Sequence, residues 1–227
     1  MYDILSKHYN RLFPDHPALG QFIVQYVAKD KLAYDLGCGT GRLSALVSSL
    51  GMQVIGYDLD RSMVEEAKCA YPDINFRVLD MTDVPDSRKV HLVTCFGNTV
   101  VHLSPERLGM FVSKLKKILH KEGFVVIQML NYDRIVRNGI TELPPIETDG
   151  ITFERRYAYL PDRLVFQVRL TLSDGTVLSD QTDLWPYTLH DMESVLDRHR
   201  FQHHAYGSLA HKPFAGNDYY LYLVIHH

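Results

Sequence analysis

Three glycines alternate with other residues between an apolar segment and a helical pattern, in the run Asp35-Leu36-Gly37-Cys38-Gly39-Thr40-Gly41. Residues 31–34 before this run suit a short buried strand, and apolar residues at helical spacing follow it until Gly51. A strand, a glycine turn and a helix in this order aim backbone N–H groups and a helix N-terminus at a ligand. The pattern predicts a cofactor-binding turn, and the alternative is a tight loop that holds no ligand.

The spacing of the glycines separates two classes of cofactor. The dinucleotide fingerprint G-x-G-x-x-G requires a glycine or alanine at the position where this chain has Arg42. Asp35 lies two residues before the first glycine, where a carboxylate suits a cationic ligand group better than a pyrophosphate. A nicotinamide cofactor is therefore disfavoured.

Acidic residues follow the next two predicted strands. The strand at 52–57 is followed by Asp58, which can accept hydrogen bonds from both ribose hydroxyls of a nucleoside. Asp60 or Ser62 suits a helix cap instead. The strand at 74–79 is followed by Asp80 and Met81, which suit an adenine amine and an adenine ring face. A fourth strand at 90–96 delivers Gly97, Asn98 and Thr99 to the same edge of the sheet.

Together these segments resemble the class I S-adenosylmethionine-dependent methyltransferases, over roughly residues 1 to 130 and again at the C-terminus. The resemblance implies S-adenosyl-L-methionine as the cofactor. It also implies an α/β fold, a Rossmann-like doubly wound seven-stranded sheet whose last strand is antiparallel. The cofactor-binding residues expected on this basis are Tyr9, Asp35, Gly37, Cys38, Gly39, Gly41, Asp58, Leu59, Met63, Asp80, Met81, Phe96, Gly97, Asn98 and His102.

Two further segments look like the glycine N-methyltransferase group and its small-molecule relatives. They are residues 95–103 (CFGNTVVHL) and 131–135 (NYDRI). In that group the histidine of the first segment lies beside the methionyl end of the cofactor, which implies this position for His102. Members that bind an amino-acid carboxylate carry an arginine just before a late Tyr-Pro, and residues 181–187 contain none. Glycine is therefore not the expected acceptor.

The composition excludes several other classes of protein. The chain has 227 residues, 46% of them hydrophobic, which suits one domain with a sizeable core. A formal net charge of −3 and the absence of a Lys/Arg block argue against nucleic acid as a partner. Three widely spaced cysteines imply neither a disulfide framework nor a metal site. No apolar run approaches the roughly 20 residues of a membrane span, so we expect no membrane association and a cytoplasmic location.

The single methyltransferase domain, residues 1–227, is expected to contain four parts. Residues 1–30 form two helices, at 2–12 and 18–28, the first of them a lid in which Tyr9 either closes over the cofactor or only packs. Residues 31–130 form the cofactor-binding α/β core. Its last helix is predicted from the Ser104 cap and Pro105 to Gly123.

The remaining two parts follow strand five. Residues 131–187 are expected to hold an inserted antiparallel meander, with strands at 151–160, 163–172 and 176–185. This meander either covers the acceptor site or forms a homodimer surface, and the two roles are compatible. Residues 188–227 are predicted to form a helix and a β-hairpin with strands at 201–209 and 218–225.

Methyl transfer needs an aligned acceptor and a dry site, because the sulfonium of the cofactor is already activated. A neutral amine needs only desolvation, whereas a hydroxyl or thiol needs a base. His102 is the candidate base, and a purely structural contact with the cofactor is the alternative. The candidate residues for binding a small-molecule acceptor are Asn131, Tyr132, Trp185 and Tyr187, which core packing would explain equally well.

The expected function is transfer of a methyl group to a small-molecule nitrogen or oxygen. One alternative is a regulatory protein that binds S-adenosylmethionine without turnover. The other is a nicotinamide-dependent oxidoreductase, against which Arg42 argues.

Overall fold

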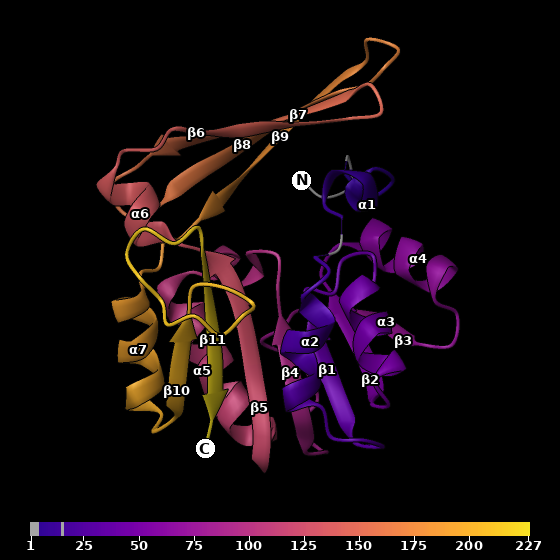
Figure 1. The fold of residues 1–227 in the computed structure, drawn as a ribbon, viewed down its shortest axis with the longest axis vertical. Coiled ribbons are helices and arrows are strands. Elements are labelled where there is room, and N and C mark those ends of the chain that lie inside the picture. Colours follow the sequence, from indigo (N-terminus) through magenta and orange to yellow (C-terminus); the bar gives the residue numbers. More distant parts are fainter. Residues whose placement is uncertain (1–4, 15) are drawn as a thin grey trace.

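The computed structural model describes residues 5–14 and 16–227. They form a seven-stranded sheet with helices on both faces and a separate four-stranded sheet above one edge of it (Figure 1). In chain order the elements are α1 (Tyr9–Leu12), α2 (Leu19–Ile23), η2 (Val24–Tyr26), β1 (Leu32–Leu36), α3 (Arg42–Ser49), β2 (Gln53–Asp58), α4 (Arg61–Ala70), β3 (Asn75–Val78), β4 (Val90–Cys95), η3 (Thr99–His102), α5 (Pro105–Ile118), β5 (Leu119–Leu130), α6 (Tyr132–Arg137), β6 (Glu142–Thr148), β7 (Ile151–Tyr159), β8 (Leu164–Thr171), β9 (Val177–Leu184), α7 (Leu189–Arg198), β10 (Gln202–Tyr206) and β11 (Tyr220–His226).

The large sheet has the strand order β10-β11-β5-β4-β1-β2-β3. Strands β1 to β5 pair in parallel, so their carboxyl ends meet at one edge. The final strand, β11, runs antiparallel to both β5 and β10. The predicted fold class is therefore confirmed, including the antiparallel last strand and the inserted antiparallel sheet.

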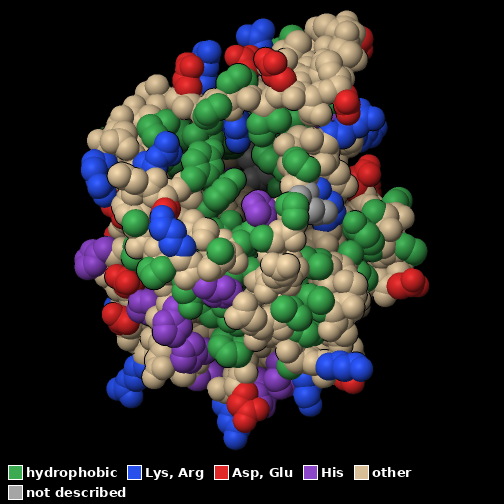
Figure 2. Space-filling view, in the orientation of Figure 1, with side chains coloured by type: hydrophobic (Ala, Val, Ile, Leu, Met, Phe, Trp, Pro, Cys, Tyr) green, Lys and Arg blue, Asp and Glu red, His purple; other side chains and the backbone are tan. Residues whose placement is uncertain are grey.

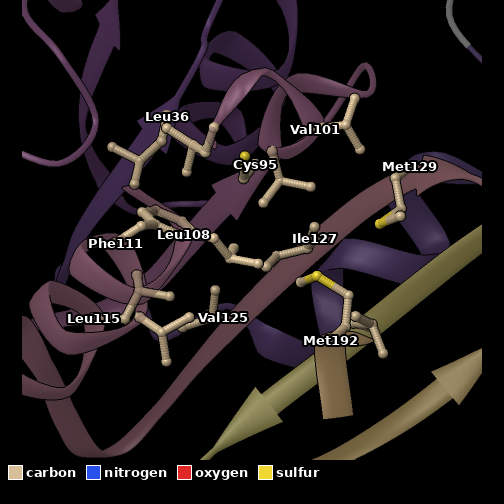
Figure 3. Packing of buried hydrophobic residues seen from close by; sticks show 14 of the residues in the cluster. Leu36, Cys95, Val101, Leu108, Phe111, Leu115, Val125, Ile127, Met129 and Met192 are labelled. Atoms are coloured by element: carbon tan, nitrogen blue, oxygen red, sulfur yellow. The ribbon is translucent and has the colours of Figure 1, made fainter. Parts of the chain in front are cut away.

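Alternation along the strands separates two layers of core. Leu32, Tyr34 and Leu36 of β1 belong to the cluster that packs under α5 and α7. Figure 3 shows part of this cluster, where side chains of α5, β4, β5 and α7 meet. Ala33 lies on the opposite face, in the cluster that contains residues of α2 and α3. Because side chains alternate along a strand, Asp35 shares the face of Ala33 and lies against α3.

The end of α5 differs from the prediction. The helix begins with the expected Ser104 cap and Pro105 but ends at Ile118, and β5 starts at Leu119. Gly123 therefore lies within the strand rather than ending the helix. A Cβ at Gly123 would lie 3.0 Å from the carbonyl oxygens of Val90 and His91, so a glycine is needed where β5 passes close to β4.

The inserted sheet has one strand more than predicted. Strands β7, β8 and β9 correspond to the three expected ones, and β6 pairs antiparallel with β7 at the edge. Pro144 and Pro145 lie within β6, where the register shifts between Leu143 and Ile146. Proline is tolerated on an edge strand because no neighbour needs its missing N–H, and the two prolines hid this strand in the sequence pattern. The short helix α6 was also not predicted.

The four-stranded sheet lies across the carboxyl ends of the parallel strands, with α1 beneath it (Figure 1). Its inner face is apolar. Phe153, Val168 and Leu170 pack there against Leu5 and Leu12 of the N-terminal segment. Its outer face is polar and holds a hollow of about 520 Å³ between charged and amide side chains. Dimerisation through this sheet stays a prediction.

The helices and strands of the two terminal segments are shorter than the sequence predicted. Residues 2–4 of the first predicted helix lie outside the described residues, and α1 covers only Tyr9–Leu12. The second predicted helix is divided into α2 and η2. Strands β10 and β11 form the predicted hairpin with a longer connection. Within the described ranges, no helix is long and apolar enough to cross a membrane.

Candidate active site

The three glycines of the turn after β1 all have positive φ angles, 70° for Gly37, 52° for Gly39 and 83° for Gly41. A Cβ at Gly37 would lie 2.3 Å from Cγ2 of Thr99, and one at Gly41 would lie 2.6 Å from the Phe76 ring. Among the described residues other than its two chain neighbours, none has an atom within 4 Å of a Cβ built on Gly39. Packing therefore explains two of the glycines, whereas Gly39 borders open space, as expected where a ligand lies against the backbone.

Asp35 lies beneath this turn and is only 2% exposed. Ser44 of α3 donates to one carboxylate oxygen at 2.6 Å, and Thr94 of β4 donates to the other at 2.8 Å. Burial raises the pKa of Asp35 to about 6, although both hydroxyl bonds oppose this shift. The carboxylate thus ties β1 to α3 and β4, and any attraction to a cofactor acts from below the turn.

Asp58 connects the end of β2 to the glycine turn. The N–H of Gly39 donates to its Oδ2 at 2.8 Å, and the N–H of Asp60 donates to its Oδ1 at 2.9 Å. Burial raises the pKa of Asp58, and these two backbone N–H groups oppose the shift. Each carboxylate oxygen can accept a second hydrogen bond, which leaves capacity for two ribose hydroxyls. The neighbouring Leu59 is 67% exposed. Of the two predicted caps, Asp60 rather than Ser62 caps α4.

Asp80, the candidate adenine ligand, is held by two partners. Its Oδ1 accepts from the N–H and the hydroxyl of Thr82 at 2.9 and 2.7 Å, and its Oδ2 pairs with Arg107 of α5. The pKa of Asp80 is lowered because the Thr82 and Arg107 contacts outweigh the effect of burial. The adjacent Met81 is partly buried against the main core. Arg107 fixes the carboxylate and was not predicted from the sequence.

The turn after β4 holds two successive left-handed residues, Gly97 with φ 71° and Asn98 with φ 67°. The Gln128 side chain accepts from the N–H of Gly97 at 2.7 Å. Asn98 accepts from the N–H of Leu130 at 3.0 Å and donates to the Tyr132 hydroxyl at 2.7 Å. These contacts fix the turn to the end of β5. Phe96 before it packs on the α2 side of the sheet.

His102 ends the short helix η3 that follows this turn. Burial lowers the pKa of His102 to about 4. The imidazole is therefore neutral near pH 7, and it is a weak base because its conjugate acid is so acidic. This environment favours a contact role for His102 over proton removal from a hydroxyl.

The N-terminal segment is fastened to the glycine turn. The Thr40 hydroxyl donates to Oδ1 of Asn10 at 2.6 Å, and the Arg42 guanidinium donates to the carbonyl of Phe13. Tyr9 is half-buried, and a Cβ at Gly97 would lie 3.4 Å from its hydroxyl. The pKa of Tyr9 is raised by burial and is also shifted by the charges of Arg42 and Asp58. Tyr9 therefore lies between the turns after β1, β2 and β4.

Two further predicted cofactor residues are buried under this arrangement. Met63 is 1% exposed and packs against Leu5 and Leu12 of the N-terminal segment. Cys38 is 8% exposed and packs against Val64 and Phe76, and burial raises the pKa of its thiol. Both residues are therefore packed in the core next to the glycine turn and α4.

The four candidate acceptor residues divide into two groups. Tyr132 is 1% exposed and meets Asn98 at the turn after β4. Asn131 is 2% exposed, caps α6 and donates to the carbonyls of Gly216 and Asp218, so the fold accounts for its burial. Trp185 and Tyr187 instead line a groove of about 290 Å³ between α5 and α7. Tyr132 and Tyr187 nevertheless belong to the same core cluster, and Trp185 packs against it.

The four-stranded sheet supplies residues that the sequence did not single out. Arg155 and Tyr157 lie on the inner face of β7, as does Phe153. Tyr220 begins β11 opposite Leu130, at the carboxyl end of β5, and is 39% exposed. Figure 2 shows the surface hollowed below the four-stranded sheet, with hydrophobic side chains around the hollow and a histidine at its edge. In the sequence, Arg155 alternates with the apolar residues Phe153 and Tyr157, and this pattern could have singled it out.

This arrangement of sheet and turns has known counterparts. Residues 33–123 match a protein family described as a methyltransferase domain. The fold is the Rossmann-like methyltransferase fold. A solved S-adenosylmethionine-dependent methyltransferase from Clostridium acetobutylicum superimposes with a TM-score of 0.86, covering 99% of this chain and 98% of that one at 16% identity. The CcbJ methyltransferase from Streptomyces caelestis gives a TM-score of 0.84, with 100% and 96% covered at 15% identity. At these identities the likeness is one of fold.

Curated relatives match only part of the chain. A putative methyltransferase of Invertebrate iridescent virus 6 is 38% identical over 72 residues, which is 31% of this chain and 27% of the relative. Trans-aconitate 2-methyltransferase of Agrobacterium fabrum is 34% identical over 98 residues, 42% of this chain and 37% of the relative. The chain thus spans only 27% and 37% of the length of these two relatives. The matches bear out S-adenosyl-L-methionine as the predicted cofactor at the level of family and fold.

Proposed function

We propose that this protein transfers a methyl group from S-adenosyl-L-methionine to a nitrogen or oxygen of a small molecule. The observation that carries the proposal is the open space above Gly39, whose backbone N–H is held by Asp58. The φ of 52° already favours glycine here, and the missing Cβ leaves the backbone open to close approach by a ligand. When bound, S-adenosylmethionine supplies the activated methyl group.

The residues at the carboxyl edge would each hold one part of this cofactor. Asp58 would accept hydrogen bonds from the ribose hydroxyls, and Asp80 and Met81 would contact the adenine. The buried charge of Asp35 would attract the methionyl ammonium from beneath the turn. Tyr9 and the N-terminal segment would cover the cofactor, because Asn10 and Phe13 are already bound to the glycine turn. Exclusion of water by this cover favours methyl transfer.

The environment of His102 limits the kind of acceptor. A histidine with a pKa of about 4 cannot remove a proton from an alcohol efficiently. An uncharged amine nitrogen or a carboxylate oxygen carries its own lone pair and needs no base. We therefore infer that one of these two groups is methylated. The closer resemblance to the glycine N-methyltransferase group is compatible with a nitrogen acceptor and is itself part of the proposal.

The first test is calorimetric titration with S-adenosylhomocysteine, with NADH as a parallel control. We expect S-adenosylhomocysteine alone to bind. Transfer of a labelled methyl group is then measured with pools of small amines and carboxylic acids. Binding of NADH alone, or of neither compound, would overturn the assignment of the cofactor. Binding of S-adenosylhomocysteine without transfer to any pool would favour the regulatory alternative.

A further inference from the structure

The arginines of β7, β8 and the turn between them differ in their partners. Arg156 pairs with Glu142 and Glu154, with N–O distances of 3.3 and 3.8 Å. Arg169 pairs with Glu154 at 3.8 Å, and Arg163 with Asp183 at 3.0 Å. Arg155 forms no ion pair with any residue in the described part of the chain. It is therefore the one of these four that has no carboxylate partner there.

Arg155 lies on the inner face of the sheet, on the opposite side from Arg156. Its Nε is buried and has no hydrogen-bond partner among the described residues, and one terminal nitrogen donates to the Pro144 carbonyl at 2.7 Å. The guanidinium also lies 5.7 Å from the centre of the Phe153 ring. A buried guanidinium N–H without a partner is costly, so this environment is explained by an acceptor that is not part of the chain.

The inner face of β7 connects Arg155 to the end of the sheet where transfer would occur. Tyr157 lies two residues further along the same face, about 7 Å away along the strand. A side-chain hydrogen bond with Tyr132 affects the Tyr157 hydroxyl, and Tyr132 in turn accepts from Asn98 at the turn after β4. The charge of Arg155 also acts on Tyr220 at the start of β11. Arg155 therefore faces the space above the carboxyl edge.

We propose that Arg155 binds an anionic group, a carboxylate or a phosphate, of the methyl acceptor. The inference rests on the proposed function and adds the chemical class of the substrate. An arginine presents paired N–H donors in a plane, which match the two oxygens of either group. Tyr157 and Tyr220 on either side would contact the body of the acceptor. The anionic end then lies under the four-stranded sheet, and the methylated atom points toward the turn after β4.

The test compares charged and neutral probes of one shape in the presence of saturating S-adenosylhomocysteine. Benzoate is paired with benzamide, and phenyl phosphate with phenol, because aromatic probes suit the tyrosines. Binding is measured by calorimetry for the wild type and for Arg155→Gln, Arg155→Lys and Arg156→Gln. Arg156 is the matched control, since it is the neighbouring arginine on the opposite face.

We expect an anionic probe to bind the wild type at least tenfold more tightly than its neutral partner. Arg155→Gln should lose this preference, Arg155→Lys should keep part of it, and Arg156→Gln should keep all of it. Whichever of benzoate and phenyl phosphate binds more tightly identifies the anionic group. Equal binding of charged and neutral probes, no binding of either anion, or a preference that survives in Arg155→Gln would overturn the inference.

The cofactor titration separates this inference from the proposed function. Arg155→Gln should bind S-adenosylhomocysteine as the wild type does, which also shows that the variant is folded. If the wild type itself fails to bind S-adenosylhomocysteine, the proposed function fails. If the wild type binds it and the anion preference is absent, only the role of Arg155 fails.

Discussion

The N–H of Gly39 donates a hydrogen bond to Oδ2 of Asp58 across 2.8 Å, which joins the glycine turn after β1 to the end of β2. The same carboxylate accepts from the N–H of Asp60 through its other oxygen. Both walls of the candidate cofactor site are therefore fixed by one side chain.

Asp58→Ala should weaken binding of S-adenosylhomocysteine at least tenfold. Charge-assisted hydrogen bonds to ribose are worth about 1.5–3 kcal/mol each, and the substitution also frees the Gly39 amide. Calorimetric titration measures the change. Asp60→Ala is the control, because it removes the α4 cap at a cost of about 1 kcal/mol in stability without removing a predicted ligand. Unchanged affinity in a folded Asp58→Ala protein would contradict the ribose assignment.

Alanine at Gly37 and at Gly39 should have different effects. At Gly37 a Cβ collides with Thr99, so we expect a large loss of stability in urea unfolding. At Gly39 the Cβ meets no other residue in the described part of the chain, so the stability cost should be limited to the positive φ, about 1–2 kcal/mol. Gly39→Ala should nevertheless bind S-adenosylhomocysteine at least tenfold more weakly. Full affinity in Gly39→Ala would show that no ligand lies against this glycine.

Thr40→Val should speed release of the cofactor. The substitution keeps the shape of the side chain and removes its 2.6 Å hydrogen bond to Asn10, which holds the N-terminal segment on the turn. We expect a severalfold faster dissociation of S-adenosylhomocysteine in stopped-flow measurements, with little change in unfolding. Asn10→Ala removes the other partner and should give the same rate. If the two variants released S-adenosylhomocysteine at different rates, the hydrogen bond between Thr40 and Asn10 would not be what holds the N-terminal segment on the turn.

Asp35→Asn should change how stability depends on pH. The folded pKa of about 6 lies above the ordinary value of 3.8, so between these values the folded state holds a proton that the unfolded state has lost. The contribution of Asp35 to stability therefore rises as the pH falls from about 6 to 4. Asparagine cannot titrate, so the stability of the variant relative to wild type should fall by roughly 3 kcal/mol from pH 7.5 to 4 in urea titrations.

His102→Gln should change the same profile in the opposite direction. The folded pKa of about 4 lies below the ordinary 6.5, so the unfolded state gains a proton first and stability is lost as the pH falls through this window. The variant should therefore become more stable than wild type by roughly 3 kcal/mol as the pH falls from about 7.5 to 4. The double variant should resemble wild type, because the two effects oppose each other. If the stability of both single variants depended on pH as that of the wild type does, the shifted pKa values of Asp35 and His102 would be contradicted.

Much of the core was predictable because its signals are local. A short apolar run predicted β1, a cap at Asp60 or Ser62 predicted the start of α4, and Ser104 with Pro105 predicted the start of α5. The end of α5 was not predictable, since Gly123 is needed for a close approach to β4 that only the paired strands create. Strand β6 was missed because its prolines are acceptable only at an edge.

The sequence by itself determined the cofactor turn and the acidic residues at the ends of the neighbouring strands, because these depend on short-range spacing along parallel strands. Only the tertiary structure decided how the side chains over that edge are used. It directed Trp185 and Tyr187 to a groove between α5 and α7 and enclosed Asp35 between two hydroxyls. It also left Nε of Arg155 without a hydrogen-bond partner among the described residues beneath the inserted sheet. These outcomes depend on packing between elements that are far apart in the sequence, and no local sequence pattern encodes such contacts.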